Sequence, residues 1–241
     1  MSSKTWLITG TSTGLGRLMT ERLLARGDKV IATLRKSGAL DDLQAQYNGR
    51  LHILLLDVTD TDAVRRTVQQ AFDFAGRIDV LVSNAGYGLF GAAEEVSDAQ
   101  IDRQIAWPNF SLYHATKWGI EGFIESVAQE VAPFGIDFMI AEPGPTATNF
   151  AGGLDTAAPM ACYDNTPAGE VRRGLAQGTL AINGDASKTV AAIIDAASGE
   201  APPFRLALGS KAYRSINEAL NSRLQVLEDT RALALSVDKD A

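Results

Sequence analysis

Short apolar runs alternate along this chain with longer amphipathic stretches, and this alternation limits the possible fold more than any other feature. A strand, a helix and a second strand in succession normally form a right-handed crossover between parallel strands. The sequence therefore predicts an α/β fold with a doubly wound, Rossmann-like parallel sheet, in a single domain over 1–241. The expected strands are 5–9, 29–33, 51–58, 78–86, 135–146 and 204–209. The expected helices are about 15–26, 39–47, 61–75, one starting near 98, 111–131, 187–198 and 210–232.

Charge and cysteine content exclude several classes of function. The formal net charge is −7, and an acidic surface repels phosphate backbones and anionic lipids, so we expect no nucleic-acid or membrane partner. No apolar run approaches the length of about 20 residues that spans a bilayer. The single cysteine, Cys162, allows no intrachain disulfide, and the opening residues lack the features of a signal peptide. We therefore expect a soluble cytoplasmic protein.

The first candidate site is the segment TGTSTGLG, 9–16, which joins the first expected strand to the first expected helix. Gly10, Gly14 and Gly16 allow a sharp turn and let backbone N–H groups approach a pyrophosphate, which the helix dipole also attracts. Glycine spacing alone would also fit an ordinary glycine-rich turn. The strand before the segment and the helix after it favour a dinucleotide site.

The end of the second expected strand indicates which dinucleotide binds. Folds of this type that bind NAD(H) usually place a carboxylate on the ribose 2′-hydroxyl about 20 residues after the glycines. Here the neighbourhood reads ATLRK, 32–36, without a carboxylate, and Arg35 can form a charge-assisted pair with a 2′-phosphate. The sequence favours NADP(H) over NAD(H), with a solvated Arg35–Lys36 surface pair as the alternative.

Two further segments follow expected strands at the sheet edge where ligands bind in such folds. Asp57 can accept a hydrogen bond from an adenine amino group, with Val58 against the ring, or it can simply cap a helix or turn. The small residues of SNAG, 83–86, would let a cofactor lie close, although such a turn is unremarkable by itself.

Tyr113 and Lys117 are four residues apart and share one face of the expected helix 111–131. A free tyrosine has a pKa of about 10, too high for acid–base work near neutral pH. An adjacent ammonium group and a cationic nicotinamide would both lower that pKa. Tyr113 could then exchange a proton with a substrate oxygen while a cofactor carries the hydride, although such pairs also occur in helices by chance.

The order of these motifs is more specific than any one of them. A glycine-rich turn, a basic end of strand two, Asp-Val, Asn-Ala-Gly, Tyr-x-x-x-Lys and Pro-Gly follow one another from Thr5 to about Thr148. In this order they resemble the short-chain dehydrogenase/reductase family, and Thr-Leu-Arg at 33–35 looks like the NADP(H)-preferring members. The resemblance implies an oxidoreductase that interconverts a small-molecule carbonyl and a secondary alcohol.

The resemblance also implies roles for single residues. Tyr113 is expected to be the catalytic acid/base, and Lys117 to bind the nicotinamide ribose and lower the pKa of the tyrosine. The expected cofactor-binding residues are Gly10, Ser12, Thr13, Gly14, Leu15, Gly16, Arg35, Asp57, Val58, Asn84, Ala85, Gly86, Lys117, Pro143, Gly144 and Thr146. No metal site is expected, and about 149–180 is expected to form the substrate lid.

The sequence departs from the family between Gly86 and Tyr113, where only 26 residues stand. Family members place there a long helix with a catalytic asparagine, then a strand, then a substrate-binding serine. The chain instead reaches Trp107–Pro108 almost at once, and Ser111 lies on a different helix face from Tyr113. By the resemblance, a central strand and part of one helix, about forty residues in all, are missing between 105 and 108, at a seam between Ala106 and Trp107. Either the protein itself lacks this segment and its sheet is rearranged, or the printed sequence omits it.

The missing segment leaves three functional hypotheses open. The chain can be an active NADP(H)-dependent oxidoreductase, or a catalytically impaired or inactive dinucleotide-binding protein that lacks the substrate-binding serine. It can also be a scaffold that assembles through helix 210–232, although the leucines at 220, 224 and 227 more often indicate packing on the same domain. A homo-oligomer is possible, but a helix that commonly forms the family's interface is truncated here.

Overall fold

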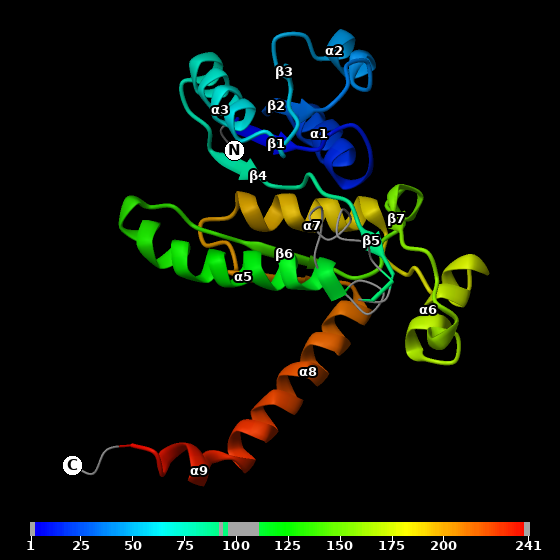
Figure 1. The fold of residues 1–241 in the computed structure, drawn as a ribbon. Coiled ribbons are helices and arrows are strands. Elements are labelled where there is room, and N and C mark those ends of the chain that lie inside the picture. Colours follow the sequence, from blue (N-terminus) through cyan, green and yellow to red (C-terminus); the bar gives the residue numbers. More distant parts are fainter. Residues whose placement is uncertain (1–2, 92–93, 96–110, 239–241) are drawn as a thin grey trace.

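The computed structural model describes residues 3–91, 94–95 and 111–238, and it divides the parallel strands between two sheets (Figure 1). The first has the order β3-β2-β1-β4, and the second pairs β6 with β8. The strands are β1 (Thr5–Thr9), β2 (Lys29–Leu34), β3 (Leu51–Leu55), β4 (Val80–Val82), β6 (Ile140–Pro143) and β8 (Arg205–Leu208). A separate parallel pair joins β5 (Leu89–Phe90) to β7 (Asp155–Thr156).

Strong local signals set the helix ends. The helices are α1 (Gly14–Arg26), α2 (Asp41–Gln46), α3 (Thr61–Ala75), α5 (Ser111–Val131), α6 (Pro167–Ala176), α7 (Ala186–Ser198), α8 (Ser210–Asp229) and α9 (Arg231–Leu235). The 3-10 turns are η1 (Ala132–Phe134), η2 (Ala151–Gly153) and η3 (Ala161–Tyr163). At the end of α1, Gly27 has φ 103° and its N–H donates to the carbonyls of Leu23 and Leu24, so the predicted helix stop is confirmed. Asp60 and Asp185 cap α3 and α7 through their carboxylates.

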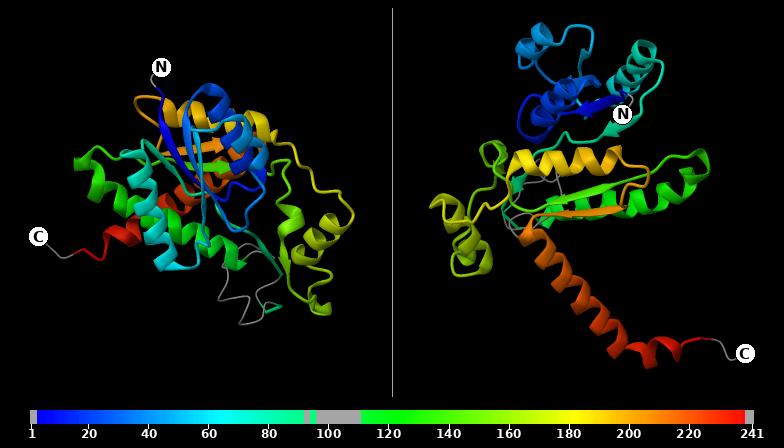
Figure 2. Two further views of the ribbon diagram at one scale, coloured as in Figure 1. Left: turned by 90° about the horizontal axis from the view of Figure 1, so that it is seen from above. Right: turned by 180° about the vertical axis from the view of Figure 1, so that it is seen from behind.

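One face of the molecule carries a core that joins the two sheets. Trp6 and Ile8 of β1 are fully buried, and they share a hydrophobic cluster with Leu23 of α1. The same cluster takes in the α7 residues Val190, Ile193 and Ile194 and, from the second sheet, Ala141 and Leu208. Helix α7 lies along the second sheet beside α1 (Figures 1 and 2). The α1–α7 face therefore holds the two sheets together.

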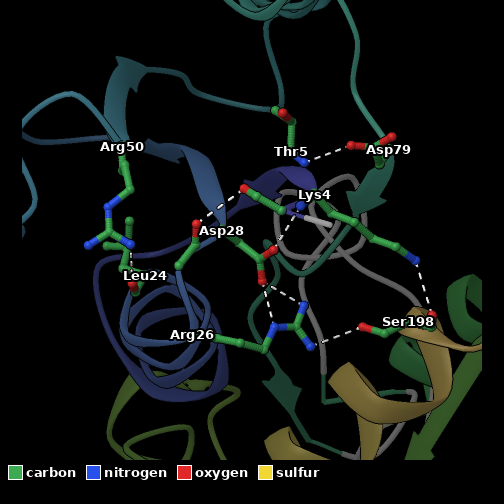
Figure 3. Close-up of polar contacts among 10 residues, drawn as sticks. Lys4, Thr5, Leu24, Arg26, Asp28, Arg50, Asp79 and Ser198 are labelled. Atoms are coloured by element: carbon green, nitrogen blue, oxygen red, sulfur yellow. Dashed lines mark hydrogen bonds and ion pairs between the residues drawn. The ribbon is translucent and has the colours of Figure 1, made fainter. Parts of the chain in front are cut away.

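Polar contacts at the amino ends of the strands fasten the same junction (Figure 3). The Lys4 ammonium donates to the carbonyl of Ser198, the last residue of α7, at 3.1 Å. The Arg26 guanidinium donates to the Ser198 hydroxyl at 3.1 Å and forms an ion pair with the buried Asp28 at 2.6 Å. Asp28 also accepts from the Lys4 backbone N–H at 2.8 Å. The C-terminus of α7 is thus bonded directly to the first sheet.

The opposite face is covered far less. There a small cluster forms where Leu7 and Ile31 meet Ala71 of α3. Along α5 the side chains of Trp118, Ile120 and Phe123 are largely exposed. A doubly wound sheet normally has helices over both faces, so this side lacks part of the expected cover.

The sheet is interrupted where a central strand was predicted to be missing. Strand β4 has β1 as its neighbour and β6 has β8, and within 3–91, 94–95 and 111–238 no strand pairs with the remaining edge of either. Leu81 in the middle of β4 is 64% exposed. The predicted α/β fold with parallel strands is confirmed, and among the described residues its strands fall into two main sheets with no strand between β4 and β6.

Other differences concern element boundaries. The strands expected at 51–58, 78–86 and 135–146 are shortened to β3, β4 and β6. Each of these lies at the edge of its sheet, where hydrogen bonds from one neighbour support a shorter pairing. Helix α6 was not expected, because its sequence lies in a region rich in Gly, Ala and Pro. The helix expected near 98 lies outside the described residues. Within the described part of the chain, no helix is both long and apolar enough to cross a membrane.

We expect the α7 contact to dominate stability. Ile194→Ala removes a side chain that is 5% exposed from the cluster that joins the sheets, and should lower the free energy of unfolding by about 2–5 kcal/mol. Ile120→Ala in α5 is the matched control, since its side chain is 47% exposed, and should change it by less than about 0.5 kcal/mol. Urea unfolding followed by circular dichroism measures both. Equal losses would show that α7 has no special role.

Candidate functional site

Two turns at the carboxyl edge of the first sheet are bonded to each other. The Thr9 hydroxyl, at the end of β1, accepts from the backbone N–H groups of Asn84 at 3.0 Å and Ala85 at 2.9 Å. In return, the Asn84 side-chain amide donates to the carbonyls of Thr9 at 2.8 Å and Gly10 at 3.0 Å. Asn84 therefore fixes the backbone of the glycine-rich turn, and Thr9, which the motif search passed over, is its partner.

The glycines in this turn are required by close approach. A Cβ at Gly10, whose φ is 69°, would lie 2.8 Å from the Ala85 Cα. A Cβ at Gly16 would lie 2.4 Å from the Gly10 carbonyl oxygen and 2.5 Å from the Asn84 amide nitrogen. Neither position has room for a side chain, so glycine is needed at positions 10 and 16 for the two turns to pack together.

The start of α1 has the properties of an anion site. Ser12 and Thr13 are exposed, and the Thr13 side chain makes no capping hydrogen bond. The first N–H groups of a helix have no partner within it, and they carry the positive end of its dipole. A phosphate at this place would be bound by backbone N–H groups. Leu15, in contrast, packs against the core and supports the turn from behind.

The basic end of β2 and the Asp-Val pair after β3 lie at the same sheet edge. The register pairs Leu34 with Leu55, which places Arg35 and Asp57 just beyond neighbouring strand ends. Asp57 accepts from the Thr59 N–H at 3.0 Å and the Thr59 hydroxyl at 2.8 Å. These hydrogen bonds, with a smaller effect of the Arg35 charge, lower the pKa of the Asp57 carboxyl. Asp57 thus caps a turn, as one of its two interpretations required, while Arg35, Asp57 and Val58 remain exposed to a ligand.

The loop after β6 reaches the glycine-rich turn from the second sheet. The Gly144 N–H donates to the Leu208 carbonyl at 2.9 Å, and the Thr146 hydroxyl donates to the Gly144 carbonyl at 2.8 Å. Further along, the Thr148 Cβ lies 4.0 Å from where a Cβ at Gly14 would stand. The structure thus brings the Pro-Gly segment, 143–146, to the same edge as the glycine-rich turn.

Helix α5 carries Tyr113 and Lys117 in its first two turns, as predicted from their spacing. The Tyr113 side chain lies outside the described residues. Burial lowers the pKa of the Lys117 ammonium and also the pKa of His114, where the charge of Glu121 opposes the effect. This desolvation is partial, since Lys117 as a whole residue is exposed to solvent.

A charged cluster fixes α5 to the second sheet. Arg205 of β8 is paired with Glu121 at 2.8 Å and Glu125 at 2.6 Å, one turn apart on α5, and with Glu142 of β6 at 2.7 Å. The three carboxylates raise the pKa of Arg205, chiefly through the Glu121 hydrogen bond. Sequence reasoning missed this cluster, because its members are up to 84 residues apart.

The expected lid is attached to the segment after β5. Arg172 of α6 pairs with Glu95 at 2.9 Å and with Asp164 at 2.7 Å, and the Glu95 side chain is 1% exposed. The Tyr163 hydroxyl donates to Glu94 at 2.9 Å, and this hydrogen bond raises the pKa of Tyr163. The described residues hold no group of three or more His, Cys, Asp or Glu arranged for a metal ion.

Comparison with known proteins assigns this arrangement to a family. A model described as short chain dehydrogenase matches residues 4–107 and 104–158. The chain belongs to the short-chain dehydrogenase family. By its family it is an oxidoreductase. A short-chain dehydrogenase structure from Streptomyces avermitilis is 34% identical with a TM-score of 0.88, over 98% of this chain and 99% of that one.

The same comparisons support a missing segment at the predicted seam. The family model matches in two pieces that meet at 104–107. The oxidoreductase BOA17 of Botryotinia fuckeliana is 29% identical over 271 aligned positions, which cover 97% of this chain and 99% of the relative. Because 97% of 241 residues is about 234, at least about 37 of those positions hold residues that this chain lacks.

Family membership does not decide between the two nicotinamide cofactors. A reductase from Brucella melitensis was solved with NADH, and it is 20% identical with a TM-score of 0.65, over 84% of this chain and 95% of that one. A short-chain dehydrogenase from Burkholderia cenocepacia was solved with NADP, and it is 22% identical with a TM-score of 0.68, over 87% and 98%. Both share the fold, and the family as a whole binds NAD(P)(H).

The close approach at Gly16 leads to a prediction. Gly16→Ala should force the two turns apart, because the neighbours of the new methyl group include backbone. We expect a stability loss of about 1–3 kcal/mol and a dinucleotide affinity lower by at least about tenfold. Gly122→Ala in α5 is the control, since a Cβ there meets nothing within 4 Å. Fluorescence titration with NADPH measures the affinity, and unchanged binding by Gly16→Ala would contradict the prediction.

Proposed function

We propose that the chain is an NADP(H)-dependent oxidoreductase that interconverts a small-molecule carbonyl and a secondary alcohol, with Tyr113 as acid/base and Lys117 as its assistant. The observation that best supports this is the hydrogen-bonded pair of Thr9 and Asn84. These bonds fix the backbone of the glycine-rich turn that leads into α1. The positions of Arg35 and Asp57 just beyond neighbouring strand ends, and of Thr148 near Gly14, also support the proposal. The single exposed Cys162 and the absence of disulfides fit a reducing compartment such as the cytoplasm.

The proposed chemistry divides between cofactor and protein. The dinucleotide supplies the hydride, which forms a new C–H bond at the carbonyl carbon. Tyr113 gives its phenolic proton to the carbonyl oxygen, so that the alcohol leaves neutral and the phenolate regains a proton from solvent. The Lys117 ammonium stabilises that phenolate and keeps its pKa low enough for the exchange. Residues 149–180, held by Arg172 and Glu95, cover the substrate.

The first experiment measures binding and turnover in the same preparation. NADPH should bind with a change in fluorescence, and oxidation of NADPH by a panel of carbonyl compounds should be lost in Tyr113→Phe while binding is kept. Loss of a general acid costs about 10²–10⁴-fold in rate. A Tyr113→Phe rate equal to that of the parent would refute the role of Tyr113, and absence of NADPH binding would refute the proposal as a whole.

The interrupted sheet favours a second candidate, a dinucleotide-binding protein with impaired catalysis. Strands β4 and β6 each have a single partner among the described residues. Ser111 is only two residues before Tyr113, on a different helix face, so it does not replace the family's substrate-binding serine. The matched test inserts, between Ala106 and Trp107, the corresponding segment of the Botryotinia fuckeliana oxidoreductase. If the second candidate is correct, the parent binds NADPH without turnover, and the insertion raises both stability and turnover. A parent that already turns over at the chimera's rate would rule it out.

Cofactor preference is tested at Arg35. Arg35→Ala removes the proposed partner of the 2′-phosphate, and a charge-assisted hydrogen bond contributes about 1.5–3 kcal/mol. NADPH affinity should therefore fall by about 10- to 100-fold while NADH affinity stays unchanged. Arg65→Ala on α3, where the side chain is 78% exposed, removes the same charge away from the site and should change neither. An equal loss for both cofactors would mean that Arg35 does not read the 2′-phosphate.

A further inference from the structure

Helix α8 carries an apolar stripe that its own domain leaves uncovered. At about 3.6 residues per turn, Tyr213, Ile216, Leu220, Leu224 and Leu227 fall on one side of the helix. Four of them, all except the half-buried Ile216, are 56–64% exposed. Leucines at this spacing more often pack on their own domain. Here α8 leads away from the rest of the domain (Figure 1 and the right panel of Figure 2).

Contacts with the body lie mainly beside this stripe, and among the stripe residues Ile216 alone is half-buried. The Arg223 guanidinium lies over the Trp118 ring of α5 at 4.4 Å, and Arg223 is on the flank of the stripe. Half-buried Ala212 lies on the same flank, near the start of the helix. The body therefore fixes the direction of α8 and leaves the stripe facing outward.

The spacing of the stripe is symmetric about Leu220. Ile216 and Leu224 each lie four residues from it, and Tyr213 and Leu227 each lie seven residues from it. In an antiparallel pair of identical helices centred on Leu220, each apolar residue would face an apolar residue. Leu220 would meet its own copy, Ile216 the other Leu224, and Tyr213 the other Leu227. Such self-complementarity is the requirement of a two-fold interface.

Charges beside the stripe favour the same antiparallel arrangement. Arg214 and Glu228 lie on one flank, six and eight residues from Leu220 on opposite sides. A two-fold rotation brings Arg214 of one helix to within two residues, about 3 Å along the axis, of Glu228 of the other, and does so twice. In the single chain Glu228 forms a long ion pair, at 4.0 Å, with Arg231 of α9. Antiparallel helix dipoles also attract each other, whereas a parallel pair would place like charges together.

We propose that α8 pairs with α8 of a second copy of this chain as an antiparallel two-helix interface. A contact along one helix is at the small end of specific interfaces, so the dimer should dissociate in the micromolar range. The proposal does not depend on cofactor binding or catalysis. It places assembly on the C-terminal helix and not on α5.

Sedimentation velocity of the full chain between about 1 and 100 μM tests the pairing. The mass should rise from 25.6 kDa toward twice that value as the concentration increases. Leu220→Asp, which buries a charge at the two-fold centre, should raise the dissociation constant by at least about tenfold. Val226→Asp changes a similarly exposed side chain off the stripe and should leave the constant unchanged. Circular dichroism checks that both variants keep their helix content.

Charge reversal gives a test that misfolding cannot imitate. Arg214→Glu should weaken the dimer, and adding Glu228→Arg should restore it, because the reversed pair is again complementary. A chain that is monomeric throughout would overturn the proposal and leave the stripe to another occupant. A dimer that Leu220→Asp does not weaken would also overturn it, by placing the interface elsewhere. Failure of the double reversal to restore association would refute the antiparallel arrangement.

Discussion

The packing of α7 against α1 is the interaction on which the rest of this structure depends. In an uninterrupted sheet, backbone hydrogen bonds run from strand to strand across the whole domain. In the part of the chain that the structure describes, that continuity stops at β4 and resumes at β6, and the buried Val190, Ile193 and Ile194 connect the two parts. The hydrogen bonds from Lys4 and Arg26 to Ser198 fix the orientation of α7, which an apolar contact alone would fix only weakly.

The candidate site is shared between the two parts. The first sheet contributes the glycine-rich turn, the Asn84 amide and the adenine-side residues, all placed by neighbouring strand ends. The second sheet contributes the 143–146 loop and, through Arg205, the position of α5 with Tyr113 and Lys117. The glycine-rich turn and the helix that carries Tyr113 and Lys117 are therefore attached to different sheets, and their relative position depends on the α1–α7 contact.

Sequence reasoning was reliable where a signal is local. The end of α1 at Gly27 and the full span of α5 from Ser111 to Val131 follow from glycine, proline and apolar spacing within one segment. It failed where the outcome depends on distant partners. Strand lengths depend on whether a neighbour exists, and the Arg205 cluster joins residues far apart in the chain. In the candidate site, the glycine spacing predicted the turn. No local pattern predicted that the Asn84 side chain would donate hydrogen bonds to the backbone of that turn.

The Arg205 cluster has a consequence for motion. Because Arg205 binds both α5 and β6, the Tyr113 helix moves with the second sheet as one body. The first sheet is joined to this body by the α1–α7 contact and by the bonds from Lys4 and Arg26 to Ser198. A dinucleotide bound as proposed would contact both the first sheet and the second sheet with its attached α5. Because no described strand bridges β4 and β6, a bound dinucleotide would also stabilise the position of one sheet relative to the other. Protein without dinucleotide should therefore sample more relative orientations of the two sheets than protein with dinucleotide bound.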